Sequence, residues 1–68
     1  MNNDTNKTKK ILIIEDEQIL GEIIFNKLVS EGYQVFLAID GEQGIQKTYE
    51  LLPDLILLDL VMPKKNGQ

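Results

Sequence analysis

Apolar and polar residues follow one another in blocks along this chain. The first block, ILII at residues 11–14, is followed by three acids, and four consecutive branched apolar residues are typical of a strand buried on both faces. Over residues 18–32 apolar positions recur at helical spacing with polar positions opposite, which predicts a helix. The main stripe of this helix is Leu20, Ile24 and Leu28, with Ile19 and Ile23 beside it.

A glycine marks the predicted end of this first helix. Gly32 can adopt the left-handed conformation just past the last turn, and Tyr33 can then fold back onto Leu28 as in a Schellman cap. The following run, YQVFLAI at residues 33–39, is dominated by β-branched and aromatic residues, so we expect a second strand there.

A second helix is predicted over residues 40–53, in the run DGEQGIQKTYELLP. Asp40 is the expected N-cap, and Gln43 three residues later completes a capping-box arrangement. Gly44 weakens the helix, and Pro53 ends it because the residue before a proline is pushed out of helical geometry. The apolar stripe is thin and consists of Ile45, Tyr49 and Leu52.

The run DLILLDL at residues 54–60 predicts a third strand, so the order of elements is β-α-β-α-β. Strands that alternate with helices of this length pair in parallel through right-handed crossovers. If the first and third strands are neighbours, the strand order is 2-1-3, and this reversal creates the crevice where open α/β sheets bind ligands. Residues 1–9 are polar and aperiodic, and we expect a disordered tail there, before the folded residues 10–68.

Acidic residues gather at one predicted edge of this sheet. Glu15, Asp16 and Glu17 follow the first strand, and Asp59 stands near the end of the third. Carboxylates at such short range repel one another unless a cation lies among them, and hard oxygen donors suit Mg²⁺, which proteins often hold together with phosphate oxygens. The sequence has no phosphate-binding glycine-rich loop, which disfavours a nucleotide site. Direct transfer of a phosphoryl group to Asp59 is the remaining interpretation.

The composition of the chain argues against several classes of function. The chain has 68 residues, enough for at most one domain with a marginal core, and it has neither cysteine nor histidine. Seven basic against eleven acidic residues give a net charge of -4, which argues against direct binding to nucleic acid or to an anionic membrane. The apolar runs are too short to span a bilayer and the first residues contain no signal-peptide core, so we expect a cytoplasmic protein.

Three stretches, ILIIEDE, the DG before the second helix and PDLILLDLVMPKKNG, resemble the first half of the response-regulator receiver domain of two-component signalling. The resemblance covers residues 10–68. It implies a truncated flavodoxin-like, doubly wound parallel sheet and a phosphoacceptor module that is not itself an enzyme. Asp59 resembles the phosphoacceptor, and the implied partner is a sensor histidine kinase or a phosphotransfer protein.

The resemblance also implies the ligands of a Mg²⁺ ion. Asp16 resembles the direct ligand, Glu15 takes the other position of the acidic pair and reaches the metal through water, and the backbone carbonyl of Val61 resembles the main-chain ligand. The same resemblance implies a Ser or Thr at the end of a fourth strand and a Lys at the end of a fifth, and this sequence contains neither strand. Lys64 and Lys65 are expected to be solvated loop residues.

Two other functions stay open. A receiver-like scaffold would act as a binding or assembly module without phosphotransfer, self-associating through the exposed outer edge of the third strand. Such association would be indifferent to Mg²⁺ and to Asp59→Asn. A Mg²⁺-dependent aspartyl phosphatase is the weaker alternative, because such enzymes typically carry a second aspartate two residues after the nucleophile, where this chain has Val61.

Overall fold

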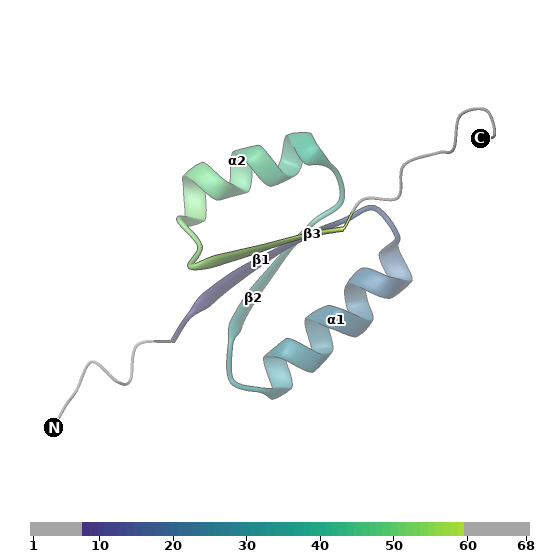
Figure 1. Cartoon of the computed structure of the whole chain (residues 1–68), viewed down its shortest axis with the longest axis vertical. Helices are drawn as coiled ribbons and strands as arrows, with labels where there is room; N and C mark the ends of the chain where they lie inside the picture. The colour runs from purple at the N-terminus through teal and green to yellow at the C-terminus, as the bar shows by residue number, and fades with distance from the viewer. Residues whose placement is uncertain (1–7, 60–68) are drawn as a thin grey trace, which may run out of the picture.

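A computed structural model describes residues 8–59 of the chain (Figure 1). The predicted alternation of strands and helices is confirmed. The elements are β1 (Lys10–Glu15), α1 (Gln18–Ser30), β2 (Gln34–Ala38), α2 (Gly41–Leu51) and β3 (Leu55–Asp59). Of the predicted tail, only Thr8 and Lys9 belong to the described residues, and both lie outside any helix or strand.

The three strands form one parallel sheet in the order β2-β1-β3, as predicted. Ile11 of β1 pairs with Val35 on one side and with Leu55 on the other. α1 covers one face of this sheet and α2 the opposite face (Figure 1). The arrangement is an α/β sheet of the flavodoxin-like type, with β1 as its central strand.

Alternate residues of β1 supply two separate cores, which explains why the strand is apolar at four consecutive positions. Toward α1 the buried residues are Ile11, Ile13 and Val35, packed against Ile24, Phe25, Leu28, Leu37 and Leu57. On the other face the buried residues are Leu12, Ile14 and Ala38, packed against Phe36. The central strand is therefore buried on both faces, as its sequence predicts.

The predicted helix ends are present. Gly32 has φ +99°, its N–H donates to the Val29 carbonyl (3.0 Å), and the Tyr33 N–H donates to the Leu28 carbonyl (3.2 Å), which is the Schellman pattern. At the start of α2, Asp40 Oδ1 accepts from the Gln43 N–H (2.8 Å). The Gln43 side chain reaches back one residue further than in a standard capping box, since its Oε1 accepts from the Ile39 N–H (3.2 Å).

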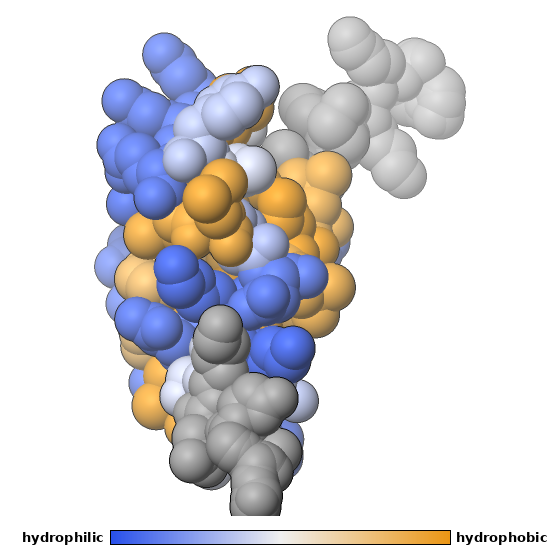
Figure 2. All heavy atoms as spheres, turned by 90° about the vertical axis from the view of Figure 1, so that its left-hand side faces the viewer, coloured by the Kyte–Doolittle hydropathy of each residue, from blue (hydrophilic) through white to orange (hydrophobic). Residues whose placement is uncertain are grey.

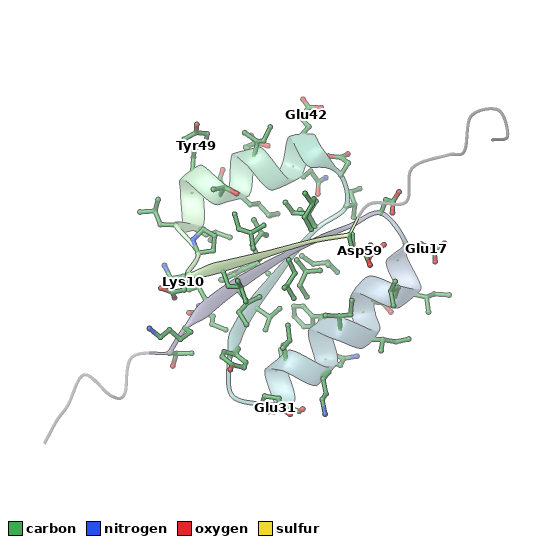
Figure 3. All side chains as sticks on the ribbon, in the orientation of Figure 1. Lys10, Glu17, Glu31, Glu42, Tyr49 and Asp59 are labelled. Atoms are coloured by element: carbon green, nitrogen blue, oxygen red, sulfur yellow. The ribbon has the colours of Figure 1, made fainter. Side chains whose placement is uncertain are left out.

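The apolar stripes of the helices are less buried than their spacing suggests. In α1 the secondary positions Ile19 and Ile23 are 73% and 60% exposed. The three stripe residues predicted for the second helix are all exposed, the last of them one position beyond α2, and Figure 3 shows Tyr49 pointing away from the sheet. α2 instead meets the sheet at the buried Gly44, where a Cβ would collide with the Ile14 side chain. The close approach of α2 to β1 thus depends on a residue that the stripe does not include.

Opposite the acidic edge, the starts of β1 and β3 are tied together. The Lys10 N–H donates to Asp54 Oδ2 (2.7 Å), the Asp54 N–H donates to the Lys10 carbonyl (2.8 Å), and Lys10 Nζ donates to the Leu51 carbonyl (2.9 Å). These bonds fix the register of β3, which then runs to Asp59.

Both helices pack on β1 and β2, and β3 is left largely uncovered. Figure 2 shows hydrophobic residues at the surface of one face of the molecule, between groups of polar residues.

Candidate functional site

The acidic edge is set by the register of the two parallel strands. Glu15, the last residue of β1, is the direct pairing partner of Asp59, the last residue of β3. Paired residues of neighbouring strands project to the same face of a sheet, so the two side chains lie on one face. Figure 3 shows Asp59 at the end of β3 near Glu17 at the start of α1. The predicted convergence of the first and third strand ends is present.

Glu15 is the buried member of this group. Its exposure is only 1%, which is unusual for a carboxylate. Its Oε2 accepts a hydrogen bond from the backbone N–H of Glu17 (3.0 Å). Its Oε1 is buried and has no hydrogen-bond partner among residues 8–59. A buried oxygen without a partner is costly, so it indicates a place where a donor or a cation would be favourable.

The surroundings of Glu15 alter its acidity. The Glu17 N–H is the strongest single influence and lowers the pKa of Glu15. Burial of the carboxyl group, together with the negative charges of Asp59 and Asp16, outweighs this effect and raises the pKa above its usual value of 4.5. The same charges that oppose ionisation of Glu15 would attract a cation to this edge.

The neighbouring acids are placed differently from Glu15. Asp16, Glu17 and Asp59 are all exposed. Glu17 is the N-cap residue of α1, with extended backbone angles and no capping hydrogen bond from its own side chain. Glu17 therefore belongs to the start of the helix, as its sequence position predicts, whereas Asp16 and Asp59 are exposed carboxylates next to the buried Glu15, one in sequence and one across the strand pair.

The residues present fit an oxygen-liganded cation by their chemistry. Glu15, Asp16 and Asp59 are hard oxygen donors, and Glu15 Oε1 is a buried acceptor that needs a partner. Within residues 8–59, no three acidic side chains are already arranged as a metal cage. The predicted main-chain ligand Val61 lies outside the described residues, as do Lys64 and Lys65. The ligand set of four therefore stays a prediction.

A buried glycine in α1, which the apolar pattern of the helix does not single out, also shapes the site. A Cβ on Gly21 would lie 3.4 Å from Cγ of Glu15 and 3.1 Å from Cδ1 of Leu37. The first turn of α1 thus rests directly on the Glu15 side chain. A glycine inside an otherwise regular helical pattern, six residues after the acidic pair begins, was the available signal.

A hollow in the described surface lies elsewhere. It has a volume of about 460 Å³ and is lined by Lys9, Ile11, Leu28, Tyr33, Asp54, Leu55 and Leu57. These residues come from the start of β1, the end of α1 and β3 with its approach, so the hollow is toward the opposite edge of the sheet from Asp59. It takes no part in the acidic site. No helix in the described part of the chain has the length and hydrophobicity needed to cross a membrane.

Comparison with known protein families bears directly on this arrangement. Residues 11–68, which include all five elements except the first residue of β1 and contain both acidic strand ends, match the response regulator receiver domain. The match agrees with the strand order 2-1-3 and with acids at the carboxyl ends of β1 and β3. On the strength of this match over most of its length, the chain belongs to the response regulator receiver domain family.

Proposed function

We propose that this chain is the phosphoacceptor module of a two-component signalling system, with Asp59 as the acceptor of the phosphoryl group. Family membership implies two-component signalling, and histidine kinases as partners in general. The observation that carries the proposal is the pairing of Glu15 with Asp59, which sets an exposed carboxylate beside a buried one at the ligand-binding edge.

The proposed reaction is an in-line displacement at phosphorus. A carboxylate oxygen of Asp59 forms a bond to phosphorus, while the bond from phosphorus to the donor breaks and its electron pair leaves with the donor. For a phosphohistidine donor the leaving atom is an imidazole nitrogen. Asp59 is suited to this role because its exposed side chain can be approached by a large donor protein.

The receiver family typically binds Mg²⁺. When bound, this ion would neutralise charge on the transferring phosphoryl oxygens. In this chain Asp16 and Asp59 would hold the ion, Glu15 would reach it through water, and Val61 would be the predicted main-chain ligand. Asp59 would then meet a donor phosphate without the full repulsion between two anions.

Incubation with acetyl phosphate and MgCl₂, followed by intact mass measurement, tests the proposal. We expect one phosphoryl adduct on the unmodified chain and none on Asp59→Asn. Asp54→Asn is the matched control, because it removes an aspartate charge at the opposite edge and keeps an oxygen that can accept from the Lys10 N–H. This control should form the adduct as the unmodified chain does.

The same measurement can refute the proposal. An adduct that survives Asp59→Asn would place the reactive group elsewhere. The absence of any adduct, under conditions that modify a full-length receiver domain, would show that residues 1–68 do not support phosphotransfer by themselves.

One observation favours a second function, assembly through β3. Leu55, Ile56 and Leu58 of this strand are exposed, and its outer edge pairs with no other strand in the described residues. Antiparallel pairing of two copies centred on Leu57 would set Ile56 opposite Leu58 of the second copy and Asp59 opposite Leu55, so that no like charges face each other. Association by this route would be indifferent to Mg²⁺ and to Asp59→Asn, which separates it from the first proposal.

A further inference from the structure

The two acids of the predicted metal pair are in different environments. Asp16 is exposed, whereas Glu15 is one of the most deeply buried side chains of the chain. The hydrogen bond from the Glu17 N–H to Glu15 Oε2 (3.0 Å) closes a small ring that contains the backbone of Asp16. A side-chain oxygen that accepts from the N–H two residues later is a recognised way of fixing a tight turn.

We infer that Glu15 is a positioning residue, which holds the backbone of Asp16 and the first turn of α1 at the edge shared with Asp59 by accepting the Glu17 N–H. The inference deepens the proposed function and rests on it for its role in phosphotransfer. It assigns different tasks to the two acids: Asp16 presents its charge, and Glu15 determines where that charge lies.

The start of α1 supports this assignment. The N-cap residue Glu17 makes no side-chain capping bond, and the first turn of α1 contains no acidic residue. The carboxylate of Glu15 is thus the acidic group that meets an otherwise unpaired N–H at this helix start. Without this hydrogen bond, the backbone on both sides of Asp16, between β1 and α1, would be less constrained.

The packing around Glu15 restricts its side chain to this task. Gly21 lies over the Glu15 side chain, and a Cβ at this position would be only 3.4 Å from Cγ of Glu15. Leu37 of β2 borders the same space, with Cδ1 at 3.1 Å from that Cβ position. The Glu15 side chain is therefore enclosed between β1 and α1, with its carboxylate directed to the helix start.

Two substitutions of Glu15 distinguish the effect of its hydrogen bond from the effect of its negative charge. Glu15→Gln removes the negative charge and keeps an oxygen that can accept from the Glu17 N–H. Glu15→Met has a similar volume and offers neither charge nor a good acceptor. Glu50→Gln and Glu50→Met are the matched controls, since Glu50 is an exposed glutamate near the end of α2.

The first readout needs neither metal nor phosphoryl transfer. In ¹⁵N-labelled protein of the full 68-residue chain, we expect the amide proton of Glu17 to keep its chemical shift and exchange rate in Glu15→Gln. In Glu15→Met its exchange should be about fivefold faster, which corresponds to the loss of a capping interaction of ~1 kcal/mol. The Glu50 variants should leave this amide unchanged.

The second readout is Mg²⁺ binding, followed through the amide signals of Asp16 and Asp59 during a titration with MgCl₂. Glu15→Met should weaken binding by about tenfold, as for residues that orient a metal ligand, and Glu15→Gln should weaken it by at most about threefold. Asp16→Asn should weaken it more than Glu15→Gln does.

Either of two results would overturn the inference. If Glu15→Met leaves the Glu17 amide as it is in the unmodified chain, the ring around Asp16 does not depend on Glu15. If Gln and Met at position 15 weaken Mg²⁺ binding equally, Glu15 acts through its charge and not through position. Failure of acetyl phosphate to modify Asp59 would defeat the proposed function alone, because the Glu17 amide reports on the ring without any phosphoryl transfer.

Discussion

At the scale of single residues, favourable and unfavourable interactions act together on the carboxyl group of Glu15. One oxygen is stabilised by the Glu17 N–H, the other is buried without a partner in residues 8–59, and Asp16 and Asp59 add like charges nearby. Functional sites commonly contain groups whose charge is poorly compensated by the protein alone. The conflict at Glu15 is the expected signature of a site completed by a bound cation.

This conflict predicts a specific dependence of stability on pH. A carboxyl group whose pKa is raised by folding binds its proton more tightly in the folded chain than in the unfolded one. Glu15 therefore contributes stability below its usual pKa of 4.5, and this contribution is lost as the pH rises through the raised pKa. Glu15→Gln cannot ionise, so its stability relative to the unmodified chain should be higher at pH 7 than at pH 4.

Urea unfolding at the two pH values measures this difference. Glu50→Gln, at an exposed position of α2, serves as the control and should show no comparable change. A difference between Glu15→Gln and the unmodified chain that is the same at pH 4 and pH 7 would contradict the raised pKa of Glu15.

At the scale of the elements, the sequence was sufficient wherever a local rule decides the outcome. The buried run in β1, the Schellman cap at Gly32 and the N-cap at Asp40 each follow from a few neighbouring residues, and all are present. The side of α2 that meets the sheet was not predictable in this way. Tyr49 of α2 and Leu52 just after it are 77% and 75% exposed, and the helix meets β1 through the buried Gly44.

The candidate site likewise has features that the sequence predicts and features that it does not. The shared edge of Glu15 and Asp59 follows from parallel strands and their order, which the alternation of elements predicts. The burial of Glu15, its bond to the Glu17 N–H and the contact with Gly21 depend on how α1 lies on the sheet. The spacing of acids along the chain contains no information on that distance, so the burial of Glu15 beside an exposed Asp16 could not be predicted from the sequence.

The close approach of α2 to β1 can be tested by adding one methyl group. Gly44→Ala would place a Cβ against the side chain of Ile14, and overpacking of this kind typically costs about 1–3 kcal/mol. Gly41→Ala is the matched control in the same helix, because a Cβ there meets no atom within 4 Å. We therefore expect a lower urea midpoint for Gly44→Ala and an unchanged or higher one for Gly41→Ala, since alanine favours helix.

A second substitution tests whether the contact with Ile14 causes the loss of stability in Gly44→Ala. Ile14→Val removes Cδ1, the atom nearest to the added methyl group, and should recover part of the stability lost in Gly44→Ala. Equal stability of Gly44→Ala and Gly41→Ala would mean that α2 can move away from β1 at no cost.

At the scale of the whole molecule, the two sides of β1 differ from the two sides of β3. The central strand has a strand on each side and a helix on each face, whereas β3 pairs with β1 alone in the described residues and contributes Leu57 to the core on the α1 side. Three of its four apolar side chains are at the surface, with Leu58 66% exposed. Strands of this kind recruit further strands unless charges or bulges protect them, and the charges of β3 and its approach are confined to Asp54 and Asp59 at its ends.

We expect this edge to make residues 1–68 associate with themselves in solution. Sedimentation velocity over a range of protein concentrations should show a species larger than the monomer that grows with concentration. Leu58→Lys should shift the population toward monomer, because a lysine opposite Ile56 of the second copy would replace an apolar contact with a charge at the pairing edge. Val29→Lys makes the same change at an exposed position of α1 and should leave the association as it is.

If the unmodified chain is monomeric at every concentration and unfolds in one sharp transition, the exposed face of β3 is tolerated by the isolated chain. The assembly function would then lose its support, while the acidic edge at Asp59 would be unaffected.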